Sequence, residues 1–385
     1  MSGFKTTLVL GGGVGGLVTA VTLRKKLAGS HRIILVDREP DHLFQPSLLW
    51  IMTGARRPKQ IVRPLDRLTN RGIEVIRGTI ESIAPERRQA VVNGTTYSGD
   101  FMVIALGAEL APESIPGLSE AGHSIYTLEG AQQLHEALQG FSSGRLVVLT
   151  AAPAYKCPAA PYEAAMLLES ELRKRKVRAQ IKIDLYAAEP GPMGVAGPEV
   201  STAVRTMVEA KGISYHPEHQ IVSVDPQTKR LHFANGVEAE FDLLAFVPPH
   251  RAPKVVREAG LLNEAGWIPV DRSTLQTQFE SVFAIGDNTT IPLKMGKPLP
   301  KAGAFAHGQA EVVANNLAHA ITGKGRPTAF TGHGDCFVEI GDGRAALGVG
   351  NFYGEPTPQI RLKAPGWRWH LGKVLFEKLW LWRWF

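Results

Sequence analysis

The 385-residue sequence predicts an α/β protein with two Rossmann-like domains and a C-terminal amphipathic segment. Three observations lead to this fold class: a glycine-rich strand–turn–helix pattern at residues 5–27, a second strand–turn–helix pattern at 146–175, and a basic, tryptophan-rich tail at 361–385. A chain of this length is too long for one ordinary core, so two or more domains are expected. Its composition, 44% hydrophobic and 21% charged, is typical of a globular protein.

The first pattern, KTTLVLGGGVGGLVTAVTLRKKL, reads as a strand, a turn and a helix, with Gly11, Gly13 and Gly16 at the positions of a G-x-G-x-x-G motif. Such glycines allow a tight turn, a close approach of the backbone to a pyrophosphate, and close packing of helix on strand. A second strand, RIILVD, ends at Asp37, where a carboxylate can accept hydrogen bonds from ribose hydroxyls. The spacing therefore predicts a dinucleotide site.

Two later segments narrow the choice of dinucleotide. DFMVIALGAE, which holds Gly107, and SVFAIGDNTT, which holds Gly286 and Asp287, each read as a strand that ends in small residues and glycine. Together with the glycine motif, and in this order, they resemble the FAD-dependent pyridine nucleotide–disulfide reductase superfamily. The resemblance implies bound FAD with Asp287 on its ribityl chain. Without the resemblance, Asp287 would be a simple turn residue.

The same resemblance implies that the FAD-binding domain is discontinuous. Residues 1–112 and 270–325 form it, and residues 113–269 form an inserted, second Rossmann-like domain. Residues 326–385 then form a C-terminal region that provides an interface and a membrane anchor.

The first turn of the inserted domain lacks the glycines that a second dinucleotide would need. Its sequence, TAAPAYKCPAAPYE, belongs to a stretch without glycine from Thr150 to Glu169. Side-chain Cβ atoms and proline rings occupy the space of a pyrophosphate, and proline has no N–H to donate. We therefore expect this domain to keep its fold but to have a degenerate NAD site.

Cys157 stands in this turn, at or just before the start of a helix. Pro158 suits the first helical position and Lys156 is adjacent, so the helix dipole and a cation are both expected to favour a reactive thiolate. Glu163 lies six residues on, where it could exchange protons with a bound sulfur species. Two plainer interpretations stay open: Cys157 as an inert buried thiol, and Glu163 as an ordinary acid at the start of a helix.

The segment KCPAAPYE resembles the active-site helix of sulfide:quinone oxidoreductases and of the flavoprotein subunit of flavocytochrome c sulfide dehydrogenase. In those families this cysteine pairs with a distant one beside the flavin, and the only candidate in this chain is Cys336. The resemblance implies that sulfide attacks a Cys157–Cys336 disulfide and that the electrons pass to FAD, with either cysteine carrying the persulfide. Many of these enzymes have a third cysteine, which is absent here, so another small sulfur compound is an alternative substrate.

The segment PLPKAGAFAHGQAEVVANNLAHAITG predicts a loop and then a helix that starts near Ala304. In the superfamily this helix points its N-terminus at the flavin, where its dipole stabilises the anionic reduced form. Lys301 resembles a lysine that those families place near flavin and quinone, although it also suits a plain surface position. Residues 41–58 resemble a flavin-contacting loop, whose aromatic side chains could equally belong to the core.

Residues 361–385 hold six Lys or Arg against one acidic residue, and five of the seven tryptophans. On a helix, one face would collect the large apolar side chains of Leu371, Val374, Leu375, Leu379 and Trp382. Burial against protein is one interpretation. The basic, tryptophan-rich character favours the headgroup region of an anionic membrane, so we expect a peripheral, monotopic protein with a quinone acceptor. Phe352 and Tyr353 are weaker candidates for a wall of the quinone site.

Other features of the sequence limit the partners and the location. It has no run of about 18 apolar residues and no charged leader before the first strand, which predicts the cytoplasmic side of the membrane. The basic tail has no nucleic-acid recognition motif, the two cysteines lack zinc spacing, and His216 and His219 are interpreted as turn residues rather than metal ligands. Family resemblance leaves a homo-oligomer open.

Three alternative functions also stay open. A sulfide dehydrogenase flavoprotein would reduce a cytochrome rather than a quinone. A type II NADH:quinone reductase would need the nucleotide turn that this chain lacks. A non-catalytic flavin redox sensor would bind FAD without turnover of sulfide and quinone.

Overall fold

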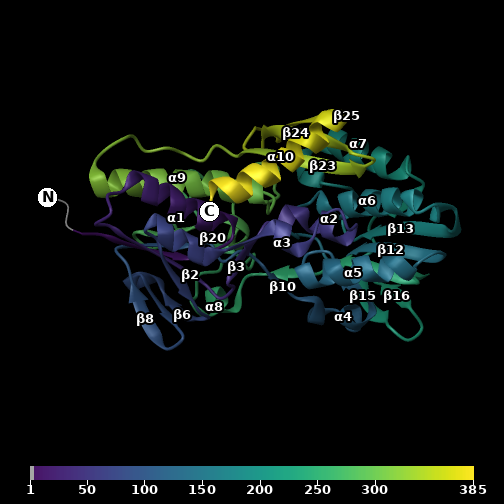
Figure 1. The fold of residues 1–385 in the computed structure, drawn as a ribbon, viewed down its shortest axis with the longest axis horizontal. Coiled ribbons are helices and arrows are strands. Elements are labelled where there is room, and N and C mark those ends of the chain that lie inside the picture. Colours follow the sequence, from purple (N-terminus) through teal and green to yellow (C-terminus); the bar gives the residue numbers. More distant parts are fainter. Residues whose placement is uncertain (1–3) are drawn as a thin grey trace.

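The computed structural model describes residues 4–385 and has two parallel β-sheets arranged along its long axis (Figure 1). The first sheet has the strand order β21-β9-β1-β2-β5, and all its neighbouring strands are parallel. Its strands are β1 (Thr6–Leu10), β2 (Arg32–Asp37), β5 (Glu74–Arg77), β9 (Phe101–Ile104) and β21 (Val282–Ala284). The late strand β21 thus returns to the sheet that residues 6–104 build.

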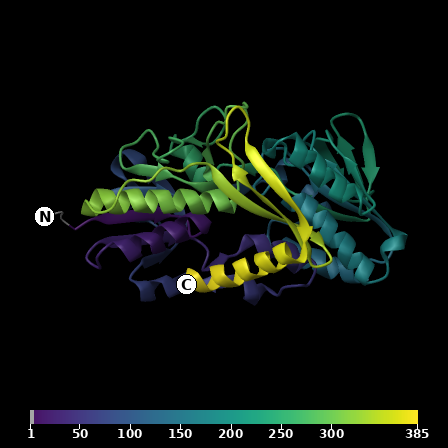
Figure 2. The same ribbon diagram turned by 90° about the horizontal axis from the view of Figure 1, so that it is seen from above.

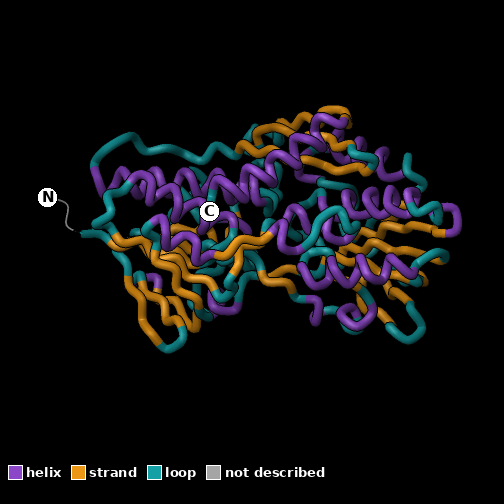
Figure 3. Tube along the Cα trace, viewed as in Figure 1, coloured by secondary structure: helices purple, strands orange, loops and turns teal. Residues whose placement is uncertain are grey.

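Helices cover one face of the first sheet and an antiparallel meander covers the other. Helices α1 (Val14–Lys26) and α9 (Gly303–Thr322) pack together on the face that carries Val9 and Leu35. Leu8 and Val36 point to the opposite face, as successive strand residues do. There they pack against the meander of β6 (Ile80–Ala84), β7 (Gln89–Val92) and β8 (Thr95–Ser98), at the lower left of Figure 3.

The second sheet repeats this plan with the strand order β11-β18-β12-β13-β14, again parallel throughout. Its strands are β11 (His123–Ser124), β12 (Gly144–Thr150), β13 (Ile181–Ala187), β14 (Ile213–His216) and β18 (Leu243–Val247). Helices α5 (Leu128–Gly140), α6 (Ala160–Lys174) and α7 (Pro198–Glu209) share one core with Leu146 and Val148. Val147 and Leu149 pack instead against the meander of β15 (Ile221–Asp225), β16 (Arg230–Phe233) and β17 (Glu238–Glu240). The predicted α/β fold with two Rossmann-like sheets is confirmed.

Short elements complete these two halves. The two-stranded sheets pair β3 (Asp41–Leu43) with β4 (Val62–Pro64), β10 (Glu109–Leu110) with β19 (His250–Arg251), and β20 (Ile268–Pro269) with β22 (Thr289–Thr290). The short helices are α2 (Leu48–Met52), α3 (Pro58–Ile61), α4 (Leu118–Ala121) and α8 (Lys254–Glu258). The β10–β19 pair joins the two segments in which the chain crosses between the halves.

The C-terminal region consists of an antiparallel three-stranded sheet and a long helix. Its elements are β23 (His333–Gly341), β24 (Arg344–Asn351), β25 (Gln359–Gly366) and α10 (Trp367–Arg383). Strand β23 packs on α6 of the second half. Helix α10 runs from this sheet toward the first half (Figure 2), where Arg71 Nη2 donates to the backbone oxygen of Phe385 (2.7 Å). The C-terminal region therefore contacts both halves of the molecule.

Candidate active site

The glycine turn after β1 has backbone contacts that only glycine permits. Gly11 has φ +106°, and a Cβ added there would lie 2.4 Å from a carbonyl oxygen. A Cβ on Gly16 would lie 1.7 Å from the carbonyl oxygen of Gly11, so any side chain would push α1 away from the turn. Gly13, the N-cap of α1, faces open space, and Asp37 Oδ2 accepts a hydrogen bond from Gly12 N. The turn thus fits a pyrophosphate at a helix N-terminus.

The two later motif glycines open at the same edge of the first sheet. Gly107, after β9, has φ +67°, and Gly286, after β21, has φ +77°. Positive φ angles of this kind favour glycine. Because β9 lies between β1 and β21, the three turns meet at the carboxyl edge, where ligands bind in sheets of this type.

Asp287 follows β21 directly and has an unsatisfied carboxylate. Its Oδ1 atom is buried and has no hydrogen-bond partner among residues 4–385. Burial raises the pKa of Asp287, while the charges of Lys156 and Lys301 act in the opposite direction. A buried polar atom without a partner is costly, and a ligand hydroxyl, such as those of a ribityl chain, would satisfy it. The chemistry of this turn therefore fits FAD.

Helix α9 begins at Gly303, one residue before the start predicted at Ala304. It reaches the Asp287 turn through Gln309, whose Oε1 accepts a hydrogen bond from Gly286 N (2.7 Å). The N-terminus of this 20-residue helix therefore lies beside the turn that fits the ribityl chain. Its dipole can stabilise negative charge there.

Lys301 is held in place just before α9. Its Nζ donates to the backbone oxygens of Asp287 (2.6 Å) and Thr289 (3.0 Å) and lies 3.3 Å from the ring centroid of Trp267. Burial lowers the pKa of Lys301 to about 8, while the charge of Asp287 opposes this shift. These contacts describe a fixed cation at the edge of the FAD site and not a freely solvated surface lysine.

The fold brings Cys157 and Cys336 to the same place. Cys157 lies in the turn before α6, where its N–H donates to the backbone oxygen of Lys301 (2.7 Å) and its carbonyl oxygen accepts from the Tyr126 hydroxyl (3.3 Å). Cys336 lies in β23, opposite Gly348 of β24. The charge of Cys157 contributes to the raised pKa of Cys336, so the two thiols are within electrostatic reach. Both are free and partly buried.

The start of α6 differs from the sequence prediction. The helix begins at Ala160, and Pro161 occupies its first turn. Pro158, predicted at the first helical position, lies in the preceding turn instead. Cys157 is therefore separated from the helix by two residues, and its N–H bonds to a loop carbonyl. The backbone N–H of Ala160, the first residue of α6, still acts to lower the pKa of Cys157, but it does not outweigh burial.

The expected thiolate character of Cys157 is also wrong for this structure. Its pKa is raised to about 12, first because of burial and then because of the nearby charge of Glu163. The positive charge of Lys373 acts in the opposite direction but does not outweigh these effects. Burial also raises the pKa of Cys336. As free groups the two cysteines are protonated thiols, so their reactivity depends on a base or on the disulfide form.

Glu163 is the acid of the site and is almost fully buried, with 2% of its surface exposed. Its Oε1 accepts hydrogen bonds from Lys373 Nζ of α10 and from Glu339 N of β23, both at 2.9 Å. Burial lowers the pKa of Lys373, but the charges of Glu163 and Glu339 outweigh it and raise the pKa. Glu163 and Lys373 thus form a buried ion pair beside the thiols, unlike an ordinary exposed acid at a helix start.

Three residues of this site were not found by sequence reasoning. Tyr126 donates to the carbonyl oxygens of Lys156 (2.6 Å) and Cys157, and Glu339 and Lys373 surround Glu163. Lys373 had been counted only as part of the basic tail. No local motif marks any of them, because each comes from a different, distant segment of the chain.

The glycine-free turn of the second half is filled by its own side chains. Glu189, after β13, accepts hydrogen bonds from the hydroxyls of Tyr155 (2.5 Å), Tyr162 (2.7 Å) and Thr150 (3.0 Å). Both tyrosines are buried. They occupy the carboxyl edge of the second sheet, where a dinucleotide would bind in a sheet of this type. These side chains fill the turn, and a degenerate NAD site stays a prediction.

Helix α10 turns its charged side chains inward and many of its apolar ones outward. Lys373 and Glu377 are buried, and Glu377 accepts from Ser47 Oγ (2.5 Å) and Arg56 Nε (2.9 Å). The exposed large apolar residues of α10 are Trp367, Leu371, Leu375, Phe376, Leu379 and Trp382. The predicted apolar face is thus open to the surface except for Val374, which is partly buried.

The remaining apolar residues of α10 belong to the core. Trp380, Leu381 and Trp384 are buried. Trp380 Nε1 donates to His42 Nε2 (3.2 Å), and His42 Nδ1 contacts the carbonyl oxygen of Gly12 (3.0 Å). No helix of residues 4–385 is both long and apolar enough to cross a membrane.

Four other residues were named from the sequence, and Phe352 and Tyr353 remain predictions for a wall of the quinone site. Phe352 packs edge-on against Phe305, with ring centroids 4.9 Å apart, and the Tyr353 hydroxyl donates to a backbone oxygen. His216 ends β14 and contacts Asp184 (2.8 Å), while His219 follows it in a loop. Within the described chain no cluster of three or more His, Cys, Asp or Glu side chains could hold a metal ion.

The aromatic side chains of the 41–58 loop are mostly core residues. Phe44 and Trp50 are both 3% exposed. Phe44 packs against Trp380, and Trp50 lies under the guanidinium of Arg56. His42 links the same loop to the glycine turn. The loop therefore joins α10 to the FAD site. Its aromatic rings lie in the core, which was one of the two interpretations of this segment.

This fold, with its three glycine turns, its unsatisfied Asp287 carboxylate and the nearby thiols, is that of a flavoprotein oxidoreductase. Its cofactor is FAD. The chain belongs to the pyridine nucleotide-disulphide oxidoreductase family, whose pattern it matches over residues 5–310.

Relatives place it more narrowly within that family. The sulfide-quinone reductase of Aquifex aeolicus is 29% identical over 98% of this chain and 91% of that protein. The crystal structure of the sulfide:quinone oxidoreductase from Aquifex aeolicus superposes with a TM-score of 0.89 at 28% identity, over 99% of this chain and 91% of that one. The type II NADH:quinone oxidoreductase of Haemophilus influenzae is also similar, at 25% identity over 81% of this chain and 80% of that protein.

Proposed function

We propose that this protein oxidises sulfide through a Cys157/Cys336 redox pair and passes the electrons to a membrane quinone. The observation that carries the proposal is that Cys336 lies within electrostatic reach of Cys157, whose N–H donates to the backbone oxygen of Lys301, and that Lys301 also contacts the Asp287 turn. The similarity to sulfide:quinone oxidoreductases supports sulfide as the donor.

The thiol pair supports a disulfide-exchange mechanism. In the oxidised pair, hydrosulfide attacks one sulfur, a new S–S bond forms, and the Cys157–Cys336 bond breaks. One cysteine then carries a persulfide and the other is a thiolate. FAD, held by the turns of Gly11, Gly107 and Gly286, supplies a two-electron acceptor.

The buried pair of Glu163 and Lys373 supports proton handling at the sulfurs. Glu163 is close enough for its charge to raise the pKa of both thiols. A carboxylate at this position can take the proton of the incoming sulfur species, and Lys373 Nζ donates a hydrogen bond to it (2.9 Å). Lys301 is proposed to hold positive charge beside the flavin and the quinone.

The outward face of α10 supports a peripheral location on an anionic membrane. Its exposed apolar residues include Leu375, Leu379 and Trp382, and the tail around them is basic. Such a face suits the interface of a bilayer, where rings and aliphatic side chains enter and cations meet phosphates. A protein in this position, on the cytoplasmic side, has direct access to quinone.

Glutamine substitutions on this face are expected to weaken membrane binding. The triple variant Leu375→Gln, Leu379→Gln, Trp382→Gln should lower the fraction bound to phosphatidylglycerol vesicles at least about tenfold, because each buried apolar side chain contributes about 1.5–3 kcal/mol. Co-sedimentation measures it. The matched control is Val222→Gln, at a position that is 53% exposed on a different element. Equal binding of the triple variant and the control would refute this use of α10.

The filled turn of the second half argues against NADH as the donor. Tyr155, Tyr162 and Glu189 occupy its carboxyl edge, and the turn offers no glycine for a pyrophosphate. A cytochrome acceptor is less suited to an apolar outward helix than a quinone is. A non-catalytic sensor would leave the arrangement of Glu163 and Lys373 without a role.

Steady-state turnover with different donors and acceptors tests the proposal. We expect the FAD-loaded protein to reduce a short-chain quinone with sulfide as the electron donor. With NADH as the donor, turnover should be at least about 10³-fold slower, because a nucleotide cannot approach the glycine-free turn of the second half. The same assay with cytochrome c in place of the quinone tests whether a cytochrome is the electron acceptor. NADH-driven turnover as fast as that with sulfide would overturn the assignment.

A further inference from the structure

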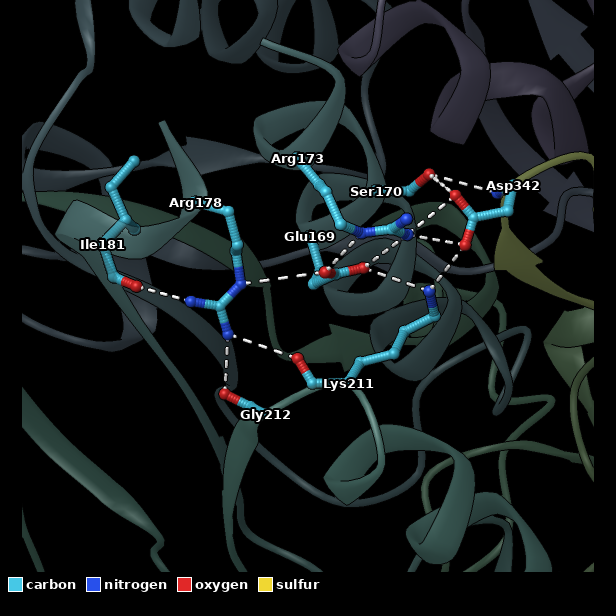
Figure 4. Close-up of polar contacts among 8 residues, drawn as sticks. All are labelled: Glu169, Ser170, Arg173, Arg178, Ile181, Lys211, Gly212 and Asp342. Carbon is cyan, nitrogen blue, oxygen red and sulfur yellow. Dashed lines mark hydrogen bonds and ion pairs between the residues drawn. The ribbon is translucent and has the colours of Figure 1, made fainter. Parts of the chain in front are cut away.

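A charged cluster joins the C-terminal half of α6 to the turn between β23 and β24, away from the thiols. Its side chains, drawn in Figure 4, come from α6, from this turn, from the short 3-10 helix at 178–180 and from the turn before β14: Glu169, Ser170, Arg173, Asp342, Arg178 and Lys211. The reaction proposed above uses none of them.

Asp342 is the residue on which the cluster converges. Its N–H donates to Ser170 Oγ (3.1 Å), and Ser170 Oγ donates in return to Asp342 Oδ1 (2.9 Å). Arg173 Nη2 donates to both carboxylate oxygens (2.7 and 2.6 Å), and Lys211 Nζ donates to one of them (3.3 Å). Burial raises the pKa of Asp342, but the bonds from Arg173 and Ser170 and the charge of Lys211 outweigh it and lower the pKa to about 2. The carboxylate is therefore charged and fixed at neutral pH.

Glu169 extends the cluster to the second sheet. It is 5% exposed and accepts hydrogen bonds from Arg173 Nε (3.1 Å) and Lys211 Nζ (3.0 Å). Arg178 Nε lies 3.8 Å from Glu169, and its guanidinium donates to the carbonyl oxygen of Ile181, the first residue of β13 (2.6 Å). The turn after β23 is thus tied both to α6 and to the sheet beneath it.

Strand β23 lies so close to α6 that one position has no room for a side chain. A Cβ on Gly341, which has φ +81°, would lie 2.5 Å from Ser170 Cβ. Nearer the thiols, Glu339 N donates to Glu163 Oε1 (2.9 Å). Strand β23 is thus attached to α6 at two points: to Glu163 through Glu339, and to Ser170 through Asp342 in the turn that follows the strand.

The position of β23 along α6 also sets the position of Cys336. The backbone of Cys157 is fixed separately, by Lys301 and Tyr126. A disulfide needs its Cβ atoms about 3.5–4.5 Å apart, whereas a strand that slips by one residue moves by about 3.3 Å. Resting on the proposed redox pair, we infer that Asp342, Ser170 and Arg173 are positioning residues, which hold β23 where Cys336 can bond to Cys157.

The test measures the disulfide itself in the FAD-loaded protein. In glutathione buffers, two thiols and one glutathione disulfide give the Cys157–Cys336 disulfide and two glutathione molecules, so the equilibrium constant reports how well the thiols are placed. Asp342→Asn is expected to lower this constant about tenfold. The matched control Glu209→Gln removes an exposed ion pair with Arg205 on α7 (2.8 Å) and should leave it unchanged.

The outcomes separate this inference from the proposed function. If the wild-type protein forms no disulfide, the redox pair itself is refuted. If wild type and Asp342→Asn have the same constant, the positioning role is refuted and the redox pair stands. Ser170→Ala removes the two hydrogen bonds between Ser170 Oγ and Asp342 and keeps the ion pairs, so it serves where Asp342→Asn does not fold. A decrease of about threefold supports the inference, and no decrease refutes it.

Discussion

Replacing either Cys157 or Cys336 by serine is expected to abolish sulfide-driven quinone reduction, with a loss of at least about 10³-fold in kcat. A serine oxygen cannot form the disulfide that sulfide attacks, nor carry a persulfide. Each variant therefore removes a sulfur atom that takes part in the reaction. Steady-state assays with sulfide and a short-chain quinone give the measurement.

The control for the serine variants is their FAD content. Neither cysteine lies in the turns of Gly11, Gly107 or Gly286, so the flavin absorbance should match that of the wild type. A non-catalytic sensor has no turnover to lose, and equal loss in both variants would exclude it. Near-normal turnover in one of them would contradict a two-cysteine mechanism.

Replacing Lys373 by methionine is expected to destabilise the protein by about 3–5 kcal/mol, because it leaves the carboxylate of Glu163 buried without its charge partner. Both side chains are at most 6% exposed, and their separation is 2.9 Å. The free energy of unfolding in urea measures the effect. The matched control is Lys378→Met, whose side chain is 53% exposed and whose loss should cost less than about 1 kcal/mol.

The double variant Glu163→Gln, Lys373→Met separates stability from catalysis. It removes the charge of Glu163 that Lys373→Met leaves without a partner, while Glu339 keeps its contact with His370 (2.9 Å), so most of the lost stability should return. Turnover should stay low, because the proton acceptor at the sulfurs is missing. If Lys373→Met is as stable as Lys378→Met, the ion pair does not hold the site together. If the double variant turns over normally, Glu163 does not handle the proton.

The parts of the site that sequence could predict are those in which a local backbone constraint dictates the residue. Gly11 and Gly16 can be predicted from the sequence, because neighbouring carbonyl oxygens leave no space for a Cβ at either position. The return of β21 to the first sheet follows from the order of the motifs and from family resemblance. Cys336 was paired with Cys157 by resemblance, and the fold brings their strand and turn together.

The parts that sequence could not predict depend on contacts between distant segments. Lys373 and Glu163 are 210 residues apart, and nothing local distinguishes Lys373 from the other cations of the tail. Hydrophobic periodicity predicts the apolar face of α10. It does not predict that the face with Lys373 and Glu377 packs inward. Pro158 and Pro161 both suit the first turn of a helix, so the sequence does not fix where α6 begins. The helix begins at Ala160, just before Pro161. The pKa of Cys157 depends on this burial, and so the thiolate prediction failed.

The most direct test of the central claim is an anaerobic stopped-flow titration of the FAD-loaded protein with sulfide, followed at flavin wavelengths. We expect rapid bleaching of the flavin with sulfide, no bleaching with NADH, and recovery of the oxidised spectrum when a short-chain quinone is added. A flavin that stays oxidised in the presence of excess sulfide would contradict it.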